Sequence, residues 1–67
     1  MVRAGSSIKI YALRYVEGSV VDVLFRASSI DNAIITGTRK ALKLKLKSYV
    51  ILDDGYHEIF HGGLANY

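Results

Sequence analysis

The chain has no cysteine, so its 67 residues must fold without disulfides and depend on a hydrophobic core. A chain this short forms one domain, and its core leaves a margin of only about 3–5 kcal/mol. Hydrophobic residues make up 51% and charged residues 22%, as is typical of a folded globular protein. The lack of thiols also excludes iron–sulfur clusters, four-cysteine zinc sites and thiol catalysis. We expect a single domain, 1–67, to which a partner or a second copy would add stability.

Residues 8–27 have the pattern of a β-hairpin. Two segments rich in Ile, Val, Leu and Tyr flank Glu17-Gly18-Ser19, which is a turn signal. If Glu17 and Gly18 are the two loop residues, Ala12 lies opposite Val23. This register gathers one apolar set on one face: Ile8, Ile10, Ala12, Val23, Phe25 and Ala27. A slip by one residue would mix this set with the other face, which favours this register.

The spacing of apolar residues predicts a helix over 29–42 that ends between Leu42 and Leu46. Ser28 or Ser29 is the expected N-cap, and Asp31 in the first turn suits the helix dipole. Gly37 costs about 1 kcal/mol relative to alanine in a helix, which is tolerated if the helix crosses a strand closely there. The apolar stripe comprises Ile30, Ala33, Ile34, Gly37, Ala41 and Leu44. Strict alternation over 42–47 leaves open a strand that begins near residue 42.

The last third of the chain predicts a second hairpin. Residues 48–52 and 56–60 have strand character, and Asp53-Asp54-Gly55 between them is a tight-turn signal. Gly62 and Gly63 break the pattern, and 1–6 and 63–67 are expected to be loose ends. The predicted order is β-β-α-β-β, with the weakest pattern in the last strand. The fold class is therefore α+β, a small two-layer sandwich of one antiparallel sheet and one helix.

A single helix covers one side of the sheet and leaves the other side open. In the register above, the open side carries adjacent apolar and aromatic residues beside arginine, as interaction surfaces do. We expect a non-enzymatic interaction module, a small regulator or inhibitor, that docks a protein partner or its own copy on this side. The predicted partner-binding residues are Tyr11, Leu13, Tyr15, Leu24 and Arg26.

Charge patterning favours a second hypothesis, nucleic-acid binding. The net charge is +3, and no acidic residue lies between Asn32 and Leu52. A basic helix flank can lie along a phosphate backbone, and bases can stack on sheet tyrosines. The residues expected to bind nucleic acid in this alternative are Arg39, Lys40, Lys43 and Lys47.

Residues 57–61, His-Glu-Ile-Phe-His, match the zinc-protease pattern H-E-x-x-H, whose chemistry requires a helix. The neighbouring turn and glycines leave no room for a helix, and two histidines at this spacing on a strand lie roughly 13 Å apart. A third ligand is also missing. Asp53 and Asp54 are explained by the turn, and no nucleophile or phosphate-loop motif is present. We therefore expect no enzymatic activity, no metal and no cofactor.

Residues 26–33, Arg-Ala-Ser-Ser-Ile-Asp-Asn-Ala, form a helix-start phrase that resembles the small RNA-polymerase inhibitors of T7-like phages and short bacterial domains. The helix of that inhibitor family is acidic whereas this one is basic, so the resemblance does not extend to the target, and no residue role is carried over. Residues 1–7 contain no apolar signal-peptide core, and no apolar run approaches the roughly 20 residues of a membrane span. A cytoplasmic location and no membrane partner are the expectation.

Overall fold

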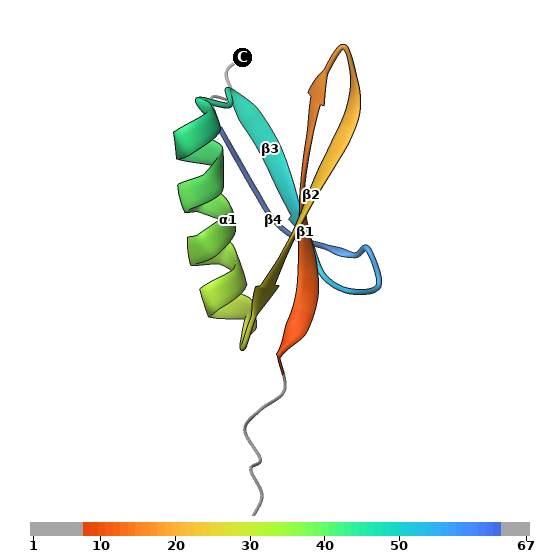
Figure 1. The fold of residues 1–67 in the computed structure, drawn as a ribbon, viewed down its shortest axis with the longest axis vertical. Coiled ribbons are helices and arrows are strands. Elements are labelled where there is room, and N and C mark those ends of the chain that lie inside the picture. The colour runs from red at the N-terminus through yellow and green to blue at the C-terminus, as the bar shows by residue number, and fades with distance from the viewer. Residues whose placement is uncertain (1–7, 64–67) are drawn as a thin grey trace, which may run out of the picture.

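The computed structural model describes residues 8–63, which form one helix and one antiparallel sheet of four strands (Figure 1). The α+β class and the order β-β-α-β-β predicted from the sequence are confirmed. The elements are β1 (Lys9–Glu17), β2 (Ser19–Ala27), α1 (Ile30–Leu44), β3 (Ser48–Leu52) and β4 (Glu58–Gly63). Of the segments 1–6 and 63–67, which were expected to be loose ends, only Gly63 lies within the described residues, and it belongs to β4.

The strands lie in the order β2-β1-β3-β4, so β2 and β4 are the two edges of the sheet. The helix packs along one face, and the opposite face has no second layer within residues 8–63 (Figure 1). The described part of the chain contains no helix that is long and apolar enough to span a bilayer.

The β1–β2 register differs by one residue from the prediction. Tyr11 pairs with Phe25 and Leu13 pairs with Val23, because Gly18 alone lies at the apex of the hairpin, between the paired Glu17 and Ser19. The φ angle of Gly18 is 82°, a left-handed conformation that glycine adopts without steric cost. A two-residue loop therefore was the wrong assumption, and β1 presents the opposite set of side chains to the helix.

The helix begins and ends as the sequence predicts. The Ser29 hydroxyl accepts a hydrogen bond from the Asn32 backbone N–H at 3.1 Å, which is an N-cap. At the other end Lys45 adopts a left-handed conformation, φ 58°. The backbone N–H groups of Lys45 and Leu46 donate to the carbonyls of Leu42 and Ala41, at 3.1 and 3.0 Å. This Schellman arrangement terminates the helix, so the alternative of a strand from residue 42 is wrong.

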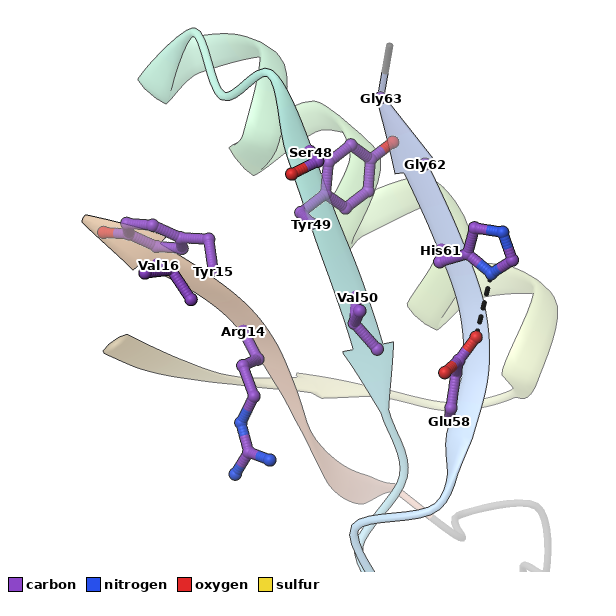
Figure 2. A pocket seen from close by; sticks show the side chains of 10 residues that line it. All are labelled: Arg14, Tyr15, Val16, Ser48, Tyr49, Val50, Glu58, His61, Gly62 and Gly63. Carbon is purple, nitrogen blue, oxygen red and sulfur yellow. Dashed lines mark hydrogen bonds and ion pairs between the residues drawn. The ribbon is translucent and has the colours of Figure 1, made fainter. Parts of the chain in front are cut away.

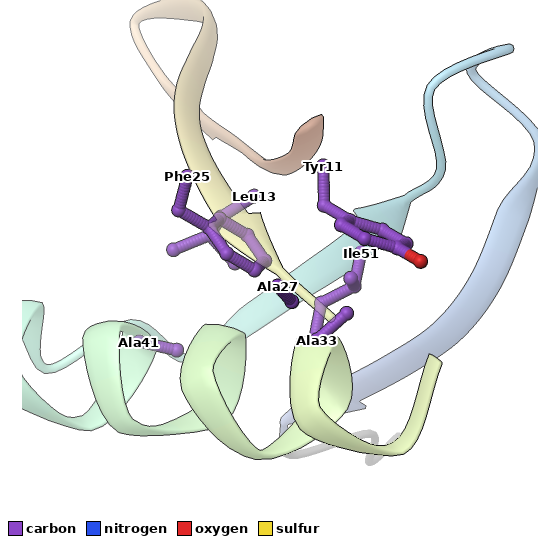
Figure 3. Packing of buried hydrophobic residues seen from close by; sticks show 7 residues of the cluster. All are labelled: Tyr11, Leu13, Phe25, Ala27, Ala33, Ala41 and Ile51. Atoms are coloured by element: carbon purple, nitrogen blue, oxygen red, sulfur yellow. The ribbon is translucent and has the colours of Figure 1, made fainter. Parts of the chain in front are cut away.

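The core lies between the helix and the odd-numbered residues of β1 and β2 (Figure 3). Leu13 and Ile51 are completely buried, and the rings of Tyr11 and Phe25 stack with centroids 6.0 Å apart. A Cβ atom at Gly37 would lie 2.5 Å from Cδ1 of Ile51, so the absence of a side chain there lets the helix approach β3. The expected close crossing at Gly37 is therefore confirmed. Of the predicted apolar stripe, Ala33, Gly37 and Ala41 are buried, whereas Ile30 and Leu44 are exposed.

The second hairpin is looser than predicted. The strands β3 and β4 are joined by the five residues 53–57, and the positive φ falls on Tyr56 (62°) rather than in Asp54-Gly55. The strand β4 then continues through Gly62 and Gly63, which were expected to end it. A glycine suits position 62 of β4, because the Tyr49 ring occupies the space that a side chain there would need.

Candidate interaction surface

The face of the sheet opposite the helix carries the even-numbered side chains of β1 and β2. Side chains alternate along paired strands, and the contact between Arg14 and Asp22 joins two members of this set. The strand β3 adds Val50 and Leu52, which pair with Arg14 and Ala12. We call this surface the open face and define it by Ile10, Ala12, Arg14, Val16, Val20, Asp22, Leu24, Arg26, Val50 and Leu52.

Apolar side chains are exposed at both ends of the open face. Near the hairpin tip, Val16 (73% exposed) lies opposite Val20. At the other end, Leu24 (59% exposed) and Ile10 (48% exposed) are diagonal neighbours on adjacent strands. Removal of such side chains from water by a bound partner stabilises the complex by roughly 25 cal/mol for each Å² buried.

A cross-strand ion pair occupies the centre of the open face. Arg14 Nε and Nη2 donate to the two carboxylate oxygens of Asp22 at 2.7 and 2.9 Å, a bidentate geometry. These hydrogen bonds lower the pKa of Asp22 and raise that of Arg14. Ala12 and Leu52, on the same face, are almost inaccessible to water. The pair leaves this part of the face without net charge.

The loop between β3 and β4 places an aromatic ring beside this ion pair. The Tyr56 ring centroid lies 5.7 Å from Cζ of Arg14, within cation–π range. Asp53 organises the loop, because its Oδ1 accepts from the backbone N–H groups of His57 and Gly55 at 2.8 and 2.9 Å. Those bonds, the one from His57 first, lower the pKa of Asp53. Tyr56 is therefore held beside the ion pair of the open face by a structured turn.

A hollow of about 820 Å³ opens where β1 and β3 separate (Figure 2). The two strands pair only over Ala12–Arg14 and Val50–Leu52, and beyond Arg14 they diverge. The lining mixes apolar and polar groups: Arg14, Tyr15, Val16, Ser48, Tyr49, Val50, Glu58, His61, Gly62 and Gly63. The hollow adjoins the open face through Arg14, Val16 and Val50, so it extends that surface rather than forming an enclosed ligand site.

The H-E-x-x-H match has no helix to support it. His57 lies in the loop and Glu58–His61 lie in β4. Nδ1 of His61 lies 2.8 Å from Oε2 of Glu58, whereas Nδ1 of His57 lies 3.5 Å from Oδ1 of Asp53 (Figure 2 shows the first pair). Each histidine therefore has its own carboxylate. In the part of the chain that the structure describes, no three His, Cys, Asp or Glu side chains are grouped to hold a metal ion.

Three of the five predicted partner-binding residues are on the wrong side of the sheet. Tyr11 (4% exposed) and Leu13 are buried beneath the helix, and Tyr15 is half-buried on the same side. Their inversion follows directly from the one-residue difference in hairpin register. Leu24 and Arg26 do lie on the open face, as expected.

Tyr11, Leu13 and Tyr15 do not lie on the open face. The residues found there or beside it instead are Ile10, Val16, Arg14 and Tyr56. The first three belong to the even-numbered set of β1, so a correct register would have identified them. Tyr56 reaches the face through the left-handed turn of the loop, for which the sequence gives no signal beyond the neighbouring Asp-Gly. Sequence patterns therefore identified the sheet but assigned the wrong face of β1.

The predicted basic residues lie on the other layer of the molecule. Helical spacing gathers Arg39, Lys40 and Lys43 on one flank of α1, and Lys40 and Lys43 lie beside Val23 of β2. Lys47 follows the helix and is exposed. This basic flank, as we call Arg39, Lys40 and Lys43, does not adjoin the open face. Tyr11 is buried, but the half-buried Tyr15 lines a small hollow together with Lys40 and Lys43, so one sheet tyrosine does lie beside the basic flank.

In comparisons with known proteins, no protein family, no curated protein and no solved structure matches the chain at a significant level.

Proposed function

We propose that the protein is a non-enzymatic interaction module that binds a protein partner through the open face. The observation that carries the proposal is the exposure of Val16, Val20, Leu24 and Ile10 on a sheet face that no second layer covers within residues 8–63. An exposed apolar surface that also carries aromatic and arginine groups is typical of protein–protein interfaces.

The charges of the open face favour a protein over a nucleic acid. Arg14 is paired with Asp22 in a bidentate contact, and Glu58, which lines the adjoining hollow, adds a negative charge beside it. A nucleic acid binds more tightly when basic side chains of the protein displace the counterions around its phosphates. Among residues 8–63, the basic side chain of the open face without an ion-pair partner is mainly Arg26. Apolar burial is therefore the main favourable term that the open face provides.

The test compares substitutions on the two layers that have matched exposure. Ile10→Asp and Val16→Asp introduce charge on the open face, and Ile35→Asp and Leu42→Asp do so on the outer surface of the helix. The exposures match closely: 48% and 73% for the first pair, 50% and 71% for the second. Partners captured from lysate by the wild-type chain would be identified by mass spectrometry, purified and titrated against all variants by calorimetry.

We expect the open-face variants to weaken binding of the purified partner by at least about tenfold, that is about 1.4 kcal/mol, and the helix variants to bind as the wild type does. Circular dichroism would verify that all four variants remain folded. Equal affinities across the four variants, or a loss confined to the helix variants, would contradict the proposal. So would the absence of any partner that binds in purified form.

A second candidate function, binding of a nucleic-acid backbone, is favoured by the basic flank. Arg39, Lys40 and Lys43 share one side of the helix, and the sequence has no acid between residues 32 and 52. If these three residues each contact one phosphate, a plot of the logarithm of the binding constant against the logarithm of the salt concentration should have a slope of about −3. Fluorescence anisotropy with duplex DNA and single-stranded RNA would measure it. No binding at low salt, or binding unchanged by Arg39→Glu with Lys43→Glu, would exclude this function.

A further inference from the structure

The outer edge of β2 is a long strand edge with no partner among residues 8–63. β2 is nine residues long, lies at the end of the sheet and pairs only with β1. Natural edge strands are protected by proline, by bulges, by short length or by charged side chains. The chain has no proline, and the β1–β2 register runs without a break from Ser19 to Ala27. The charged residues of β2 are Asp22 and Arg26, which have opposite signs, so they do not exclude a second strand of the same sequence, and this edge is a template for one.

We propose that the strand which pairs with this edge is β2 of a second copy, antiparallel, with Leu24 opposite Leu24 on a two-fold axis. Residues that lie opposite each other in an antiparallel pair point to the same side of the sheet. A two-fold axis perpendicular to the sheet keeps both helices on one side and both open faces on the other. The axis must then pass between two identical residues, so each choice of central residue is one possible register.

Charge selects Leu24 as the central residue. An axis at Asp22 or at Arg26 would place like charges opposite each other, which is destabilising. An axis at Val23 would place Asp22 opposite Leu24, and an axis at Phe25 would place Arg26 opposite Leu24. Only the axis at Leu24 places Asp22 of each copy opposite Arg26 of the other, and it does so twice. Residues 21–27 then pair over a length typical of native strands.

The two faces of this pairing agree with the charge argument. On the helix side, Val23 of each copy lies opposite Phe25 of the other, an apolar and aromatic pair that favours sheet pairing. On the open side, the row formed by Arg14 and Asp22 continues to Arg26 of the second copy. The product is a continuous eight-stranded sheet in which the two open faces adjoin. The pairing does not depend on the proposed function, because the backbone groups of the β2 edge form it, although Asp22, Leu24 and Arg26 also belong to the open face.

Charge exchange between two variants tests this register. Arg26→Glu alone places Asp22 opposite Glu, and Asp22→Arg alone places Arg opposite Arg26, so each variant should be a monomer of 7.4 kDa by light scattering. When the two variants are mixed, both cross-strand positions regain opposite charges, and a one-to-one heterodimer should form. The wild-type chain should be a dimer. Circular dichroism would verify folding, since Asp22→Arg also removes the ion pair with Arg14.

Cysteine cross-linking keeps the charges intact and reports the axis directly, because the chain has no native cysteine. In the proposed register the residues at position 24 have Cβ atoms about 5 Å apart, whereas those at position 20 are roughly 27 Å apart. Leu24→Cys should therefore form a disulfide-linked dimer on mild oxidation, and Val20→Cys should not.

Several outcomes would overturn the inference. One is a wild-type mass of a single chain up to about 1 mM protein. Another is a dimer that persists in both charge variants, or preferential cross-linking at position 20. A dimer that is abolished by Val16→Asp but survives Arg26→Glu would show association through the open face instead. Because Val16 lies outside the paired segment, failure of the strand pairing and failure of the proposed function give different results.

Discussion

At the scale of single residues, the contact between helix and sheet is set at Gly37. A Cβ atom there would lie 2.5 and 2.9 Å from Cδ1 and Cγ1 of Ile51, a side chain that is completely buried. Alanine is favoured over glycine in a helix by about 1 kcal/mol, but overpacking a closed core costs about 1–3 kcal/mol. The packing cost should exceed the gain in helix propensity, because both Cγ1 and Cδ1 of the completely buried Ile51 would have to shift.

We therefore predict that Gly37→Ala lowers the free energy of unfolding by about 1 kcal/mol. In an Ile51→Val background, which lacks Cδ1, the same substitution should cost less or become stabilising. Urea denaturation of the wild type, the two single variants and the double variant measures this coupling. The same change in both backgrounds would mean that the two residues do not compete for space.

Asp53 is a second residue whose role can be tested, through pH. Its pKa lies below the ordinary value of 3.8, mainly because the His57 backbone N–H donates to the carboxylate and also because that of Gly55 does. Since the folded-state pKa is the lower one, the stabilisation is complete above the ordinary value. It is lost as the pH falls through the folded-state pKa.

Asp53→Asn keeps an acceptor oxygen but cannot titrate, so its free energy of unfolding should fall less steeply between about pH 5 and about pH 2 than that of the wild type. Urea denaturation at several pH values measures the two slopes. Some pH dependence should remain in the variant, because the pKa of Asp22 is also lowered by Arg14. Identical slopes for the two proteins would show that the loop carboxylate does not stabilise the folded state.

At the scale of elements, the helix end contains a correctable strain. Lys45 occupies a left-handed position, φ 58°, which glycine tolerates better than lysine by about 1 kcal/mol. Lys45→Gly should therefore raise the free energy of unfolding by about that amount. Lys43→Gly is the matched control, because the same chemical change two residues earlier, within the last turn of the helix, should lower it by about 1 kcal/mol. Thermal and urea denaturation distinguish the two, and a loss of stability in both variants would contradict this account.

The elements themselves could be predicted because each is bounded by a local chemical signal. Ser29 caps the helix, and Asp53 begins the loop after β3. The hairpin register could not be predicted in the same way. It depends on whether Gly18 lies alone at the apex or shares a two-residue loop with Glu17, and both arrangements suit the same sequence. Apolar residues lie on both faces of β2, with Val20 and Leu24 on one and Val23 and Phe25 on the other, so hydrophobic sorting favoured the wrong register.

At the scale of the whole molecule, the two layers differ in chemistry. The open face combines exposed aliphatic side chains with a neutralised ion pair, whereas the helix layer carries the basic flank. The sequence predicted this division, since a single helix leaves one side of the sheet uncovered and the basic residues of the helix can be read from its sequence. It could not predict which side chains of β1 face outward, because that depends on pairing between strands rather than on the pattern within one strand.

The size of the molecule also couples stability to association. Leu13 and Ile51 are the largest completely buried side chains among residues 8–63, so the core of one copy is small. For a small domain of this kind the margin of stability is about 3–5 kcal/mol. Pairing of β2 with a second copy would add to that margin in proportion to the logarithm of the protein concentration, because only the folded chain associates.

We predict that the Tm of the wild-type chain rises with protein concentration. Two chains of 67 residues have an unfolding entropy of about 280 cal/mol/K, so a tenfold increase in concentration should raise the Tm of a dimer by about 5 °C. Melts followed by circular dichroism from about 10 μM to about 1 mM would measure the slope. Arg26→Glu should melt at a Tm that does not depend on concentration, and its mixture with Asp22→Arg should regain the dependence. A flat Tm for the wild type would mean that the single copy holds its fold unaided and that the β2 edge stays unpaired.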